Sequence, residues 1–211
     1  SKDFKIKLKK YDIKLNSSKW YRKRFMTNDE KVKKTINGLL NKLTDKNYEE
    51  VTNKILRLKI ENYDLLEYLC KNILEKCLLE NEYLKNWCYL VKKLFCNNLN
   101  KWNYNDRHIY EIFLELCQKK FEKVINTDYH NKLAELYNED IDLFYKIKNK
   151  NCNLLLLLAE FYNLKFLNID ISKSIAKKLM KDKSKYYELE LGILFSNNLK
   201  LNNLNNKILE S

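Results

Sequence analysis

The near absence of glycine and proline constrains this chain more than any other feature of its sequence. Its 211 residues include two Gly and no Pro, and these are the residues on which tight turns between strands mostly depend. Amphipathic helices joined by polar connections do not need them. Apolar residues make up 45% of the sequence and charged residues 33%, a balance that suits helices with one buried face. The composition therefore predicts an all-α protein.

Apolar residues recur at steps of three and four along most of the sequence, which is the period of a one-faced helix. The clearest stripes begin at Val32, Leu66, Leu84 and Ile109. Residues 154–167 are apolar almost all round, so we expect that helix in the middle of the fold. Two further amphipathic helices are expected at about 171–181 and 185–199.

Taken in pairs, these helices form hairpins that begin near residues 31, 62, 106 and 171. The first two intervals bracket the repeat of about 40 residues found in HEAT-type helical arrays. The sequence thus predicts a right-handed α-solenoid of about four to five HEAT-type hairpins. The third interval contains an insertion at about 126–151, whose polar and acidic middle predicts a long exposed loop with some helix.

An extended basic arm, residues 1–27, precedes the helical domain predicted for residues 28–211. Phe4, Ile6 and Leu8 alternate with lysines, which is the period of a strand and not of a helix. An extended segment leaves its backbone donors unpaired. We therefore expect the arm to lie on its own domain or on a partner.

The net charge of +13 attracts phosphate polyanions and predicts sequence-independent affinity for nucleic acid. The alternative is that lysine is abundant because the coding sequence is A/T-rich, and that the charge only solvates helix surfaces. The candidate RNA-binding residues lie on the arm and are Lys5, Lys7, Lys9, Lys10, Arg22, Lys23 and Arg24. Nearby aromatic residues such as Trp20 offer stacking faces for bases. A solvated tail remains the alternative for this segment, and no pattern suggests base-specific recognition.

No motif for catalysis or for metal binding is found. The sequence has no glycine-rich phosphate loop and no H-E-x-x-H pair, and its carboxylate pairs fall at predicted surface positions. The cysteines have no C-x-x-C spacing, and neither His108 nor His130, interpreted as a loop histidine, completes a zinc set. We expect no enzyme activity, no cofactor and no metal site. The thiols are predicted to be free and mostly buried, in a reducing compartment.

Nothing in the sequence predicts membrane insertion. The longest apolar run, residues 154–159, is far shorter than the ~20 residues of a membrane span. No secretory signal opens the chain. We therefore expect a soluble cytoplasmic protein.

Four separated stretches resemble the middle domain of eukaryotic translation initiation factor 4G, in order and at compatible spacing. They are "INGLLNKLTDKNY" (36–48), "ILEKCLLENEY" (73–83), "LELCQKKFEK" (114–123) and "AEFYNLKFL" (159–167). Upstream, "SSKWYRKR" (17–24) is similar to the tryptophan-containing linker that precedes the domain in that family. The resemblance covers about Trp20 to Asp182, and more weakly extends to Lys200. Within the first stretch, the residues themselves predict that Thr44 caps the second helix of the opening hairpin.

The resemblance implies a scaffold for translation initiation that holds and activates the DEAD-box RNA helicase initiation factor 4A and binds RNA. Other initiation factors and the small ribosomal subunit are further implied partners. The implied helicase-binding residues are Trp20, Asn41, Lys42, Phe121, Leu157 and Phe161. For the last three, the apolar period favours a core position instead. Trp20 is exposed in the arm pattern and is the expected anchor, with docking on its own domain as the alternative.

Two features depart from the family. The usual glycine-asparagine entry to the long buried helix is replaced by "NCNLL" (151–155), and about four helical pairs are found where the family has five. Related middle domains serve in mRNA decay, in splicing and in cap binding, several of them with other DEAD-box helicases. A basic helical solenoid that binds RNA without a helicase is a third interpretation.

Overall fold

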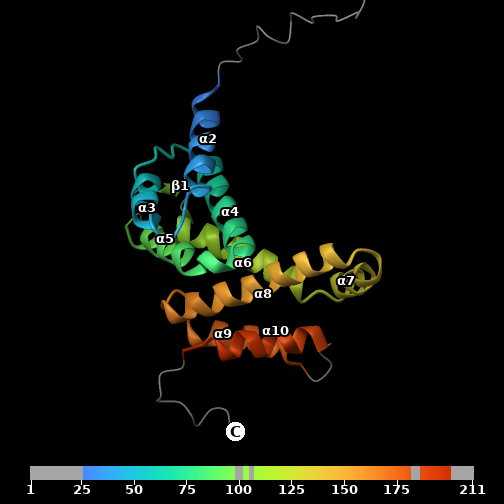
Figure 1. Cartoon of the computed structure of the whole chain (residues 1–211). Coiled ribbons are helices and arrows are strands. Elements are labelled where there is room, and N and C mark those ends of the chain that lie inside the picture. The colour runs from blue at the N-terminus through green and yellow to red at the C-terminus, as the bar shows by residue number, and fades with distance from the viewer. Residues whose placement is uncertain (1–25, 98–101, 105–106, 182–185, 201–211) are drawn as a thin grey trace, which may run out of the picture. The chain divides into compact units, whose positions relative to one another are not determined.

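The computed structural model describes residues 26–97, 102–104, 107–181 and 186–200 (Figure 1). The chain divides into two compact units, Ser1–Lys31 and Val32–Ser211, and each is described by itself. In the first unit, Thr27 and Glu30 form a reciprocal cap at the start of α2 (Asn28–Leu40). The amide of Thr27 donates to Oε2 of Glu30 at 2.9 Å, and the amide of Glu30 donates to Oγ1 of Thr27 at 3.2 Å. This pattern satisfies amides that have no partner inside the helix.

The second unit is mostly helical, in agreement with the all-α prediction. After α2 follow α3 (Tyr48–Leu56), α4 (Tyr63–Leu79), α5 (Leu84–Asn97), α6 (Ile109–Val124), α7 (Thr127–Glu139), α8 (Ile141–Asn163), α9 (Ile169–Leu179) and α10 (Tyr186–Asn197). A 3-10 turn, η2 (Asn81–Tyr83), precedes α5. Within the described ranges, the only strands are β1 (Asn103–Tyr104) and β2 (Arg107–His108), which pair antiparallel.

Asparagine and aspartate begin the helices of this proline-free chain. Asn62, Asn126, Asp140 and Asn168 each stand at an N-cap, and each side chain accepts a hydrogen bond from a backbone amide of the first turn. Replacing such a cap by alanine typically costs about 1 kcal/mol. The caps explain why the hairpins begin close to the predicted positions, with α4 at Tyr63 and α9 at Ile169.

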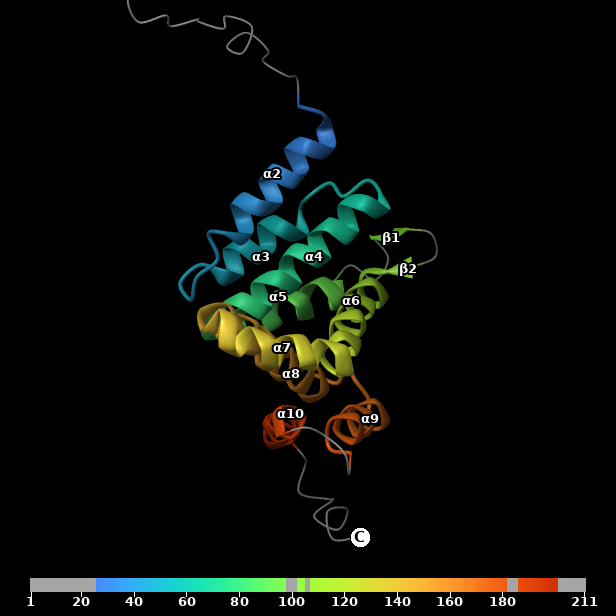
Figure 2. The same cartoon turned by 90° about the vertical axis from the view of Figure 1, so that its right-hand side faces the viewer.

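The helices of the second unit contact one another in two series (Figure 2). In one series, α3 packs against α5, α5 against α8, and α8 against α10. In the other, α4 packs against α6, while α8 also contacts α4, α6 and α9. Consecutive hairpins therefore pack side by side, with α8 in contact with both series.

One set of connections lies along one edge, which we call the turn edge and define as residues 41–47, 80–83 and 125–126. Nδ2 of Asn86, at the start of α5, donates to Oδ1 of Asp45 in the first of these connections at 2.5 Å. Near the ends of α4 and α6, Nζ of Lys120 lies 2.5 Å from Oε1 of Glu75. These contacts place three successive turns beside one another.

The other connections lie beside one another at the opposite ends of the helices. The hydroxyl of Tyr104 donates to the carbonyl of Ile60, which joins the β1–β2 ribbon to the α3–α4 connection. The hydroxyl of Tyr110, at the start of α6, donates to the carbonyl of Phe166 in the α8–α9 connection at 2.6 Å. From α2 to α7 the connections thus alternate between two edges.

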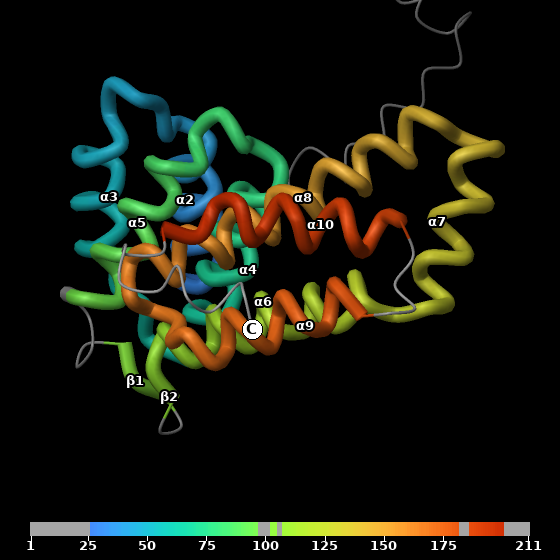
Figure 3. Tube along the Cα trace, turned by 90° about the horizontal axis from the view of Figure 1, so that it is seen from below, coloured from blue at the N-terminus to red at the C-terminus, as the bar shows by residue number. Residues whose placement is uncertain are grey.

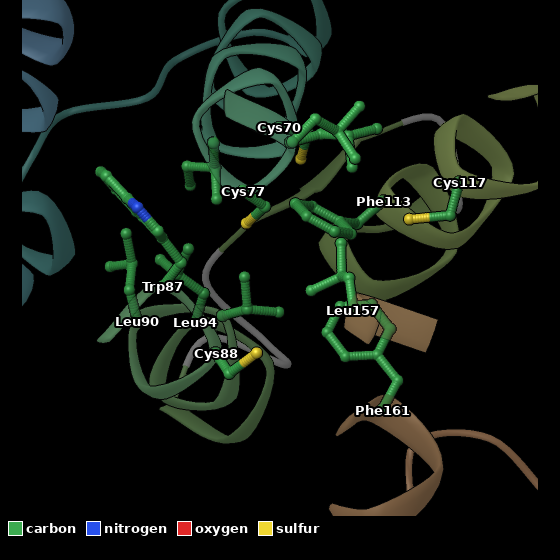
Figure 4. Packing of buried hydrophobic residues seen from close by; sticks show 14 of the residues in the cluster. Cys70, Cys77, Trp87, Cys88, Leu90, Leu94, Phe113, Cys117, Leu157 and Phe161 are labelled. Carbon is green, nitrogen blue, oxygen red and sulfur yellow. The ribbon is translucent and has the colours of Figure 1, made fainter. Parts of the chain in front are cut away.

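The core lies between α4, α5, α6 and α8 (Figure 4). Trp87 of α5, Phe113 of α6 and Leu157 of α8 are among its fully or almost fully buried side chains. Phe95 meets the rings of Phe113 and Phe161 edge to face, with centroids 5.9 and 6.2 Å apart. Such ring pairs stabilise beyond their buried area. The core is therefore continuous from the second hairpin to the long helix.

For residues 126–151 the prediction was a long exposed loop with some helix, and the loop part of it is wrong. These residues form α7 and the first part of α8, whose 23 residues extend far upstream of the predicted buried helix. The apolar period of 154–167 was correct for the buried part, but the polar residues before it continue the same helix. None of the helices in the described part of the chain has the length and apolar character needed to cross a membrane.

We expect Phe161→Ala to lower the free energy of unfolding by about 3–5 kcal/mol, because it leaves a cavity in a packed core. The matched control is Asn149→Ala, an exposed position on the same helix, which should change the value by less than about 0.5 kcal/mol. Urea denaturation followed by circular dichroism measures both. Equal stability of the two variants would contradict the core assignment of Phe161.

A candidate partner-binding turn

The connection between α2 and α3, residues 41–47, combines exposed side chains with a fixed backbone. Nδ2 of Asn47 donates to the carbonyl of Lys42 at 2.7 Å, and Oδ1 of Asn47 accepts from the amide of Thr44 at 2.8 Å. Leu43 is buried between them. Asn41 and Lys42 are exposed. The turn therefore presents these two side chains from a backbone that is held at both ends.

The prediction that Thr44 caps the second helix is wrong. Helix α3 begins at Tyr48, and its N-cap is Asn47, whose side chain makes no hydrogen bond to the helix. That side chain bonds the loop instead, and the carbonyl of Thr44 accepts from the amide of Asn47 at 3.2 Å. The local competition between a loop bond and a helix cap is a property of short polar side chains. Asp45 contacts Asn86 of α5 and links the turn to the next hairpin.

Three predicted helicase-binding residues lie in the core. Leu157 and Phe161 are 0% exposed, and Phe121 is 6% exposed. A direct contact with a partner is incompatible with this burial, so the assignment to the helicase-binding surface is corrected to the core position that their apolar period had favoured. Phe121 also lines a groove between α6 and α9 with Ile171 and Lys178. None of the three is brought together with the turn at 41–47.

The remaining predicted site residues are on the arm and lie outside the described residues. They are Trp20, the proposed helicase anchor, and the RNA-binding candidates Lys5, Lys7, Lys9, Lys10, Arg22, Lys23 and Arg24. Among the predicted site residues, Asn41 and Lys42 are the ones that are both described and exposed.

A polar cluster that the sequence did not predict joins α7, α8 and α10. Nδ2 of Asn151 donates to the hydroxyls of Tyr129 and Tyr187, each at 3.0 Å. Nε2 of His130 lies 3.1 Å from Oε1 of Glu188, so His130 is a buried helix residue and not a loop histidine. Burial raises the pKa of Tyr187 above its usual value. No spacing of residues along the sequence indicates such a cluster, because its members come from three distant segments.

Ion pairs also fix several charged side chains at the surface of the fold. Glu75 lies between Lys120 and Lys150, at 2.5 and 3.4 Å. Partial burial acts to raise the pKa of Glu75, but the two lysines lower it overall. On α6, hydrogen bonds from Lys119 and Arg107 lower the pKa of Glu115 to about 2. These lysines therefore serve the fold, whereas no hydrogen bond or ion pair of the Lys42 side chain is found within the described residues.

The described cysteines and histidines show structural roles. All six cysteines are free, and Cys70, Cys77, Cys88 and Cys117 are buried, as predicted. Burial raises the pKa of Cys88 to about 12, which disfavours the reactive thiolate at neutral pH. Across the described ranges, no group of three or more His, Cys, Asp or Glu residues could hold a metal ion. The chemistry that the turn offers is binding through an amide and an ammonium group.

Comparison with protein-family models and with curated proteins finds no match for this chain. Functional proposals therefore depend on its own residues and on the four stretches that resemble the initiation-factor domain.

We expect Asn47→Ala to loosen the turn, because the substitution removes both loop hydrogen bonds and leaves their partners to water. The free energy of unfolding should fall by about 1–2 kcal/mol. Asn47→Asp keeps the acceptor for the amide of Thr44 but loses the donor to Lys42, so its effect should be smaller. Hydrogen exchange at the Thr44 amide provides the local measurement. Unchanged protection in the alanine variant would show that Leu43 alone fixes the turn.

Proposed function

We propose that this chain is a HEAT-type scaffold of translation initiation, which binds the DEAD-box RNA helicase initiation factor 4A and RNA in the cytoplasm. The observation that carries the proposal is the turn at 41–47. It falls within "LLNKLT" (39–44), one of the two motifs that most favour this family. Leu40 and Leu43 of the motif are buried, so packing in the core explains why these two positions are apolar. Asn41 and Lys42 are exposed and are not required by the fold around them, which favours a binding role.

The second motif, "CQKKFE" (117–122), supports the fold of such a scaffold but not its contacts. Cys117 and Phe121 are buried. Gln118 donates to Glu122 at 2.7 Å, and the two lysines pair with Glu115 and Glu75. Every side chain of this motif therefore has a structural partner, and the turn at 41–47 is the better candidate for recognition.

The alternation of hairpins between two edges supports the solenoid part of the proposal. In such arrays each repeat contacts its neighbours, and successive turns form a row that partners can bind. The contacts from Asp45 to Asn86 and from Glu75 to Lys120 align the turns in this way. We therefore infer that a partner of the first turn extends along the turn edge.

The proposed mechanism is a shift in the population of helicase conformations. A scaffold that binds the productive arrangement of the two helicase lobes more tightly than the open one favours the productive state. The size of the shift equals the difference in binding free energy between the two states. ATP hydrolysis remains with the helicase, and this chain contributes contacts only.

The charge of +13 supports a second candidate, a basic solenoid that binds RNA or a ribosomal subunit without a helicase. A scaffold of mRNA decay or splicing that binds another DEAD-box helicase is the closest alternative. Titration of the purified chain with initiation factor 4A and with other DEAD-box helicases, in the presence of RNase, separates the three.

Lys42→Glu should weaken binding of initiation factor 4A by about tenfold, since it reverses a charge at the candidate contact. Trp20→Ala should weaken it by roughly 2 kcal/mol, the scale of an interface hot spot, with unchanged thermal stability. Lys173→Glu, an exposed position on α9, carries the same charge reversal as Lys42→Glu and serves as its control. Affinity is measured by fluorescence anisotropy, and stimulation of ATPase activity provides a second readout.

Absence of helicase binding by the unaltered chain would remove the proposed function and favour the RNA-only solenoid. Equal weakening by Lys42→Glu and Lys173→Glu would indicate a general charge effect, and the turn would lose its assigned role.

RNA affinity should fall steeply as salt is raised, because each neutralised phosphate releases counterions. Reversing the charges at Arg22, Lys23 and Arg24 should flatten the dependence of log K on log salt by about 0.7 for each lost contact with single-stranded RNA. Filter binding across a salt series measures the slope. A slope that the reversals leave unchanged would assign these residues to a solvated tail.

A further inference from the structure

Helices α7 and α8 form a hairpin whose tip exposes large apolar side chains beside acidic ones. We call α7 and the first part of α8, residues 127–147, the finger. Tyr137, Ile141, Leu143 and Tyr145, at its tip, are between 42% and 49% exposed. In Figure 3, α7 lies at the end of the second unit opposite to α3. Clustered large apolar side chains on an exposed hairpin commonly mark an interaction surface.

Beside the tip, the finger carries a groove. Its volume is about 450 Å³, and its lining includes Leu133 and Leu136 of α7 and Ile147 of α8. Lys123 and Lys132 line the same groove. Leu143 lies one turn before Ile147 on the same side of α8, so the apolar surface continues from the groove towards the tip.

The charges along α7 complement one another when the helix meets a reversed copy of itself. Lys132 and Glu139 are seven residues apart, which places them about 10 Å apart on one side of the helix. Both are exposed, and no ion pair is found for either of them within the described ranges. Leu136 lies midway between them and lines the groove. A basic end, an apolar centre and an acidic end thus follow one another along one surface.

We propose that the finger is a self-association surface and that its partner is the finger of a second copy of this chain. Two copies of α7 pack antiparallel about a two-fold axis near Leu136. Lys132 of each copy then meets Glu139 of the other, and the apolar side chains at the tip of each finger cover the groove of the other. An isologous contact needs a surface that complements itself in this way.

Charge also distinguishes this partner from RNA. Residues 135–146 contain Glu135, Glu139, Asp140 and Asp142 against the single cation Lys146. An acidic tip repels phosphate, while it is attracted by a chain whose net charge is +13. The basic end and the acidic end of this pattern both lie on α7. A second copy of the chain therefore supplies the complementary surface by itself. A contact limited to one hairpin from each copy is small, and small interfaces are commonly weak.

Sedimentation velocity of the full chain, from about 1 μM to several hundred μM, tests the proposal. The unaltered chain should change from monomer to dimer within this range. Lys132→Glu and Glu139→Lys should each raise the dissociation constant about tenfold, since each places like charges opposite one another twice. An equimolar mixture of the two variants should dimerise again, because both contacts in the mixed dimer then join opposite charges.

The controls are Lys173→Glu and Glu61→Lys, which make the same charge changes at exposed positions outside the finger and should dimerise like the unaltered chain. Thermal melts confirm that all variants fold. A chain that stays monomeric at every concentration overturns the proposal. Dimers that the finger variants leave intact, or that their mixture fails to restore, overturn it as well.

Discussion

The second unit depends on the burial of the middle of α8. Leu154, Leu155, Leu157 and Phe161 are at most 1% exposed, and the helix contacts α4, α5, α6, α7, α9 and α10. The other helices are amphipathic and bury one face each, so they need a common apolar neighbour. Nδ2 of Asn153 donates to the carbonyl of Leu78 at 2.9 Å, which satisfies a polar group at the entry to this buried stretch. Without α8, the apolar faces of α4 and α10 would lose the helix against which both of them pack.

The periodic part of this fold could be predicted from the sequence. Stripes at steps of three and four gave the helices and their pairing into hairpins, because a packed helix must bury one face. The ends of the first turn could not be predicted, since Thr44 and Asn47 are both good caps. Only the loop bonds that the Asn47 side chain makes with Lys42 and Thr44 decide between them. The exposure of Asn41 and Lys42 followed from their place after the last apolar residues of α2.

The finger was missed because its stability comes from distant residues. The buried residues of α7 are His130 and Leu133. Two buried positions are too few to form an apolar period that predicts a helix. His130 meets Glu188, and Asn151 meets Tyr129 and Tyr187, so the helix is held by contacts that span two other segments. Tertiary contacts of this kind override local preference. Phe121 differs, because its apolar period already indicated the core position in which it lies.

Self-association of the finger has a consequence for RNA binding. A two-fold dimer carries two copies of the arm, and each copy contributes the cations Arg22, Lys23 and Arg24. Binding of the second arm to one RNA is then intramolecular, and linked sites of this kind can raise overall affinity by about 10²–10⁴ when both can engage. The carboxylates of the two tips repel phosphate, so charge separates the surface that joins two copies from the segment proposed to hold RNA. Because dimerisation is concentration-dependent, the avidity for long RNA depends on how much of the chain is present, whereas binding to an RNA that spans a single arm does not.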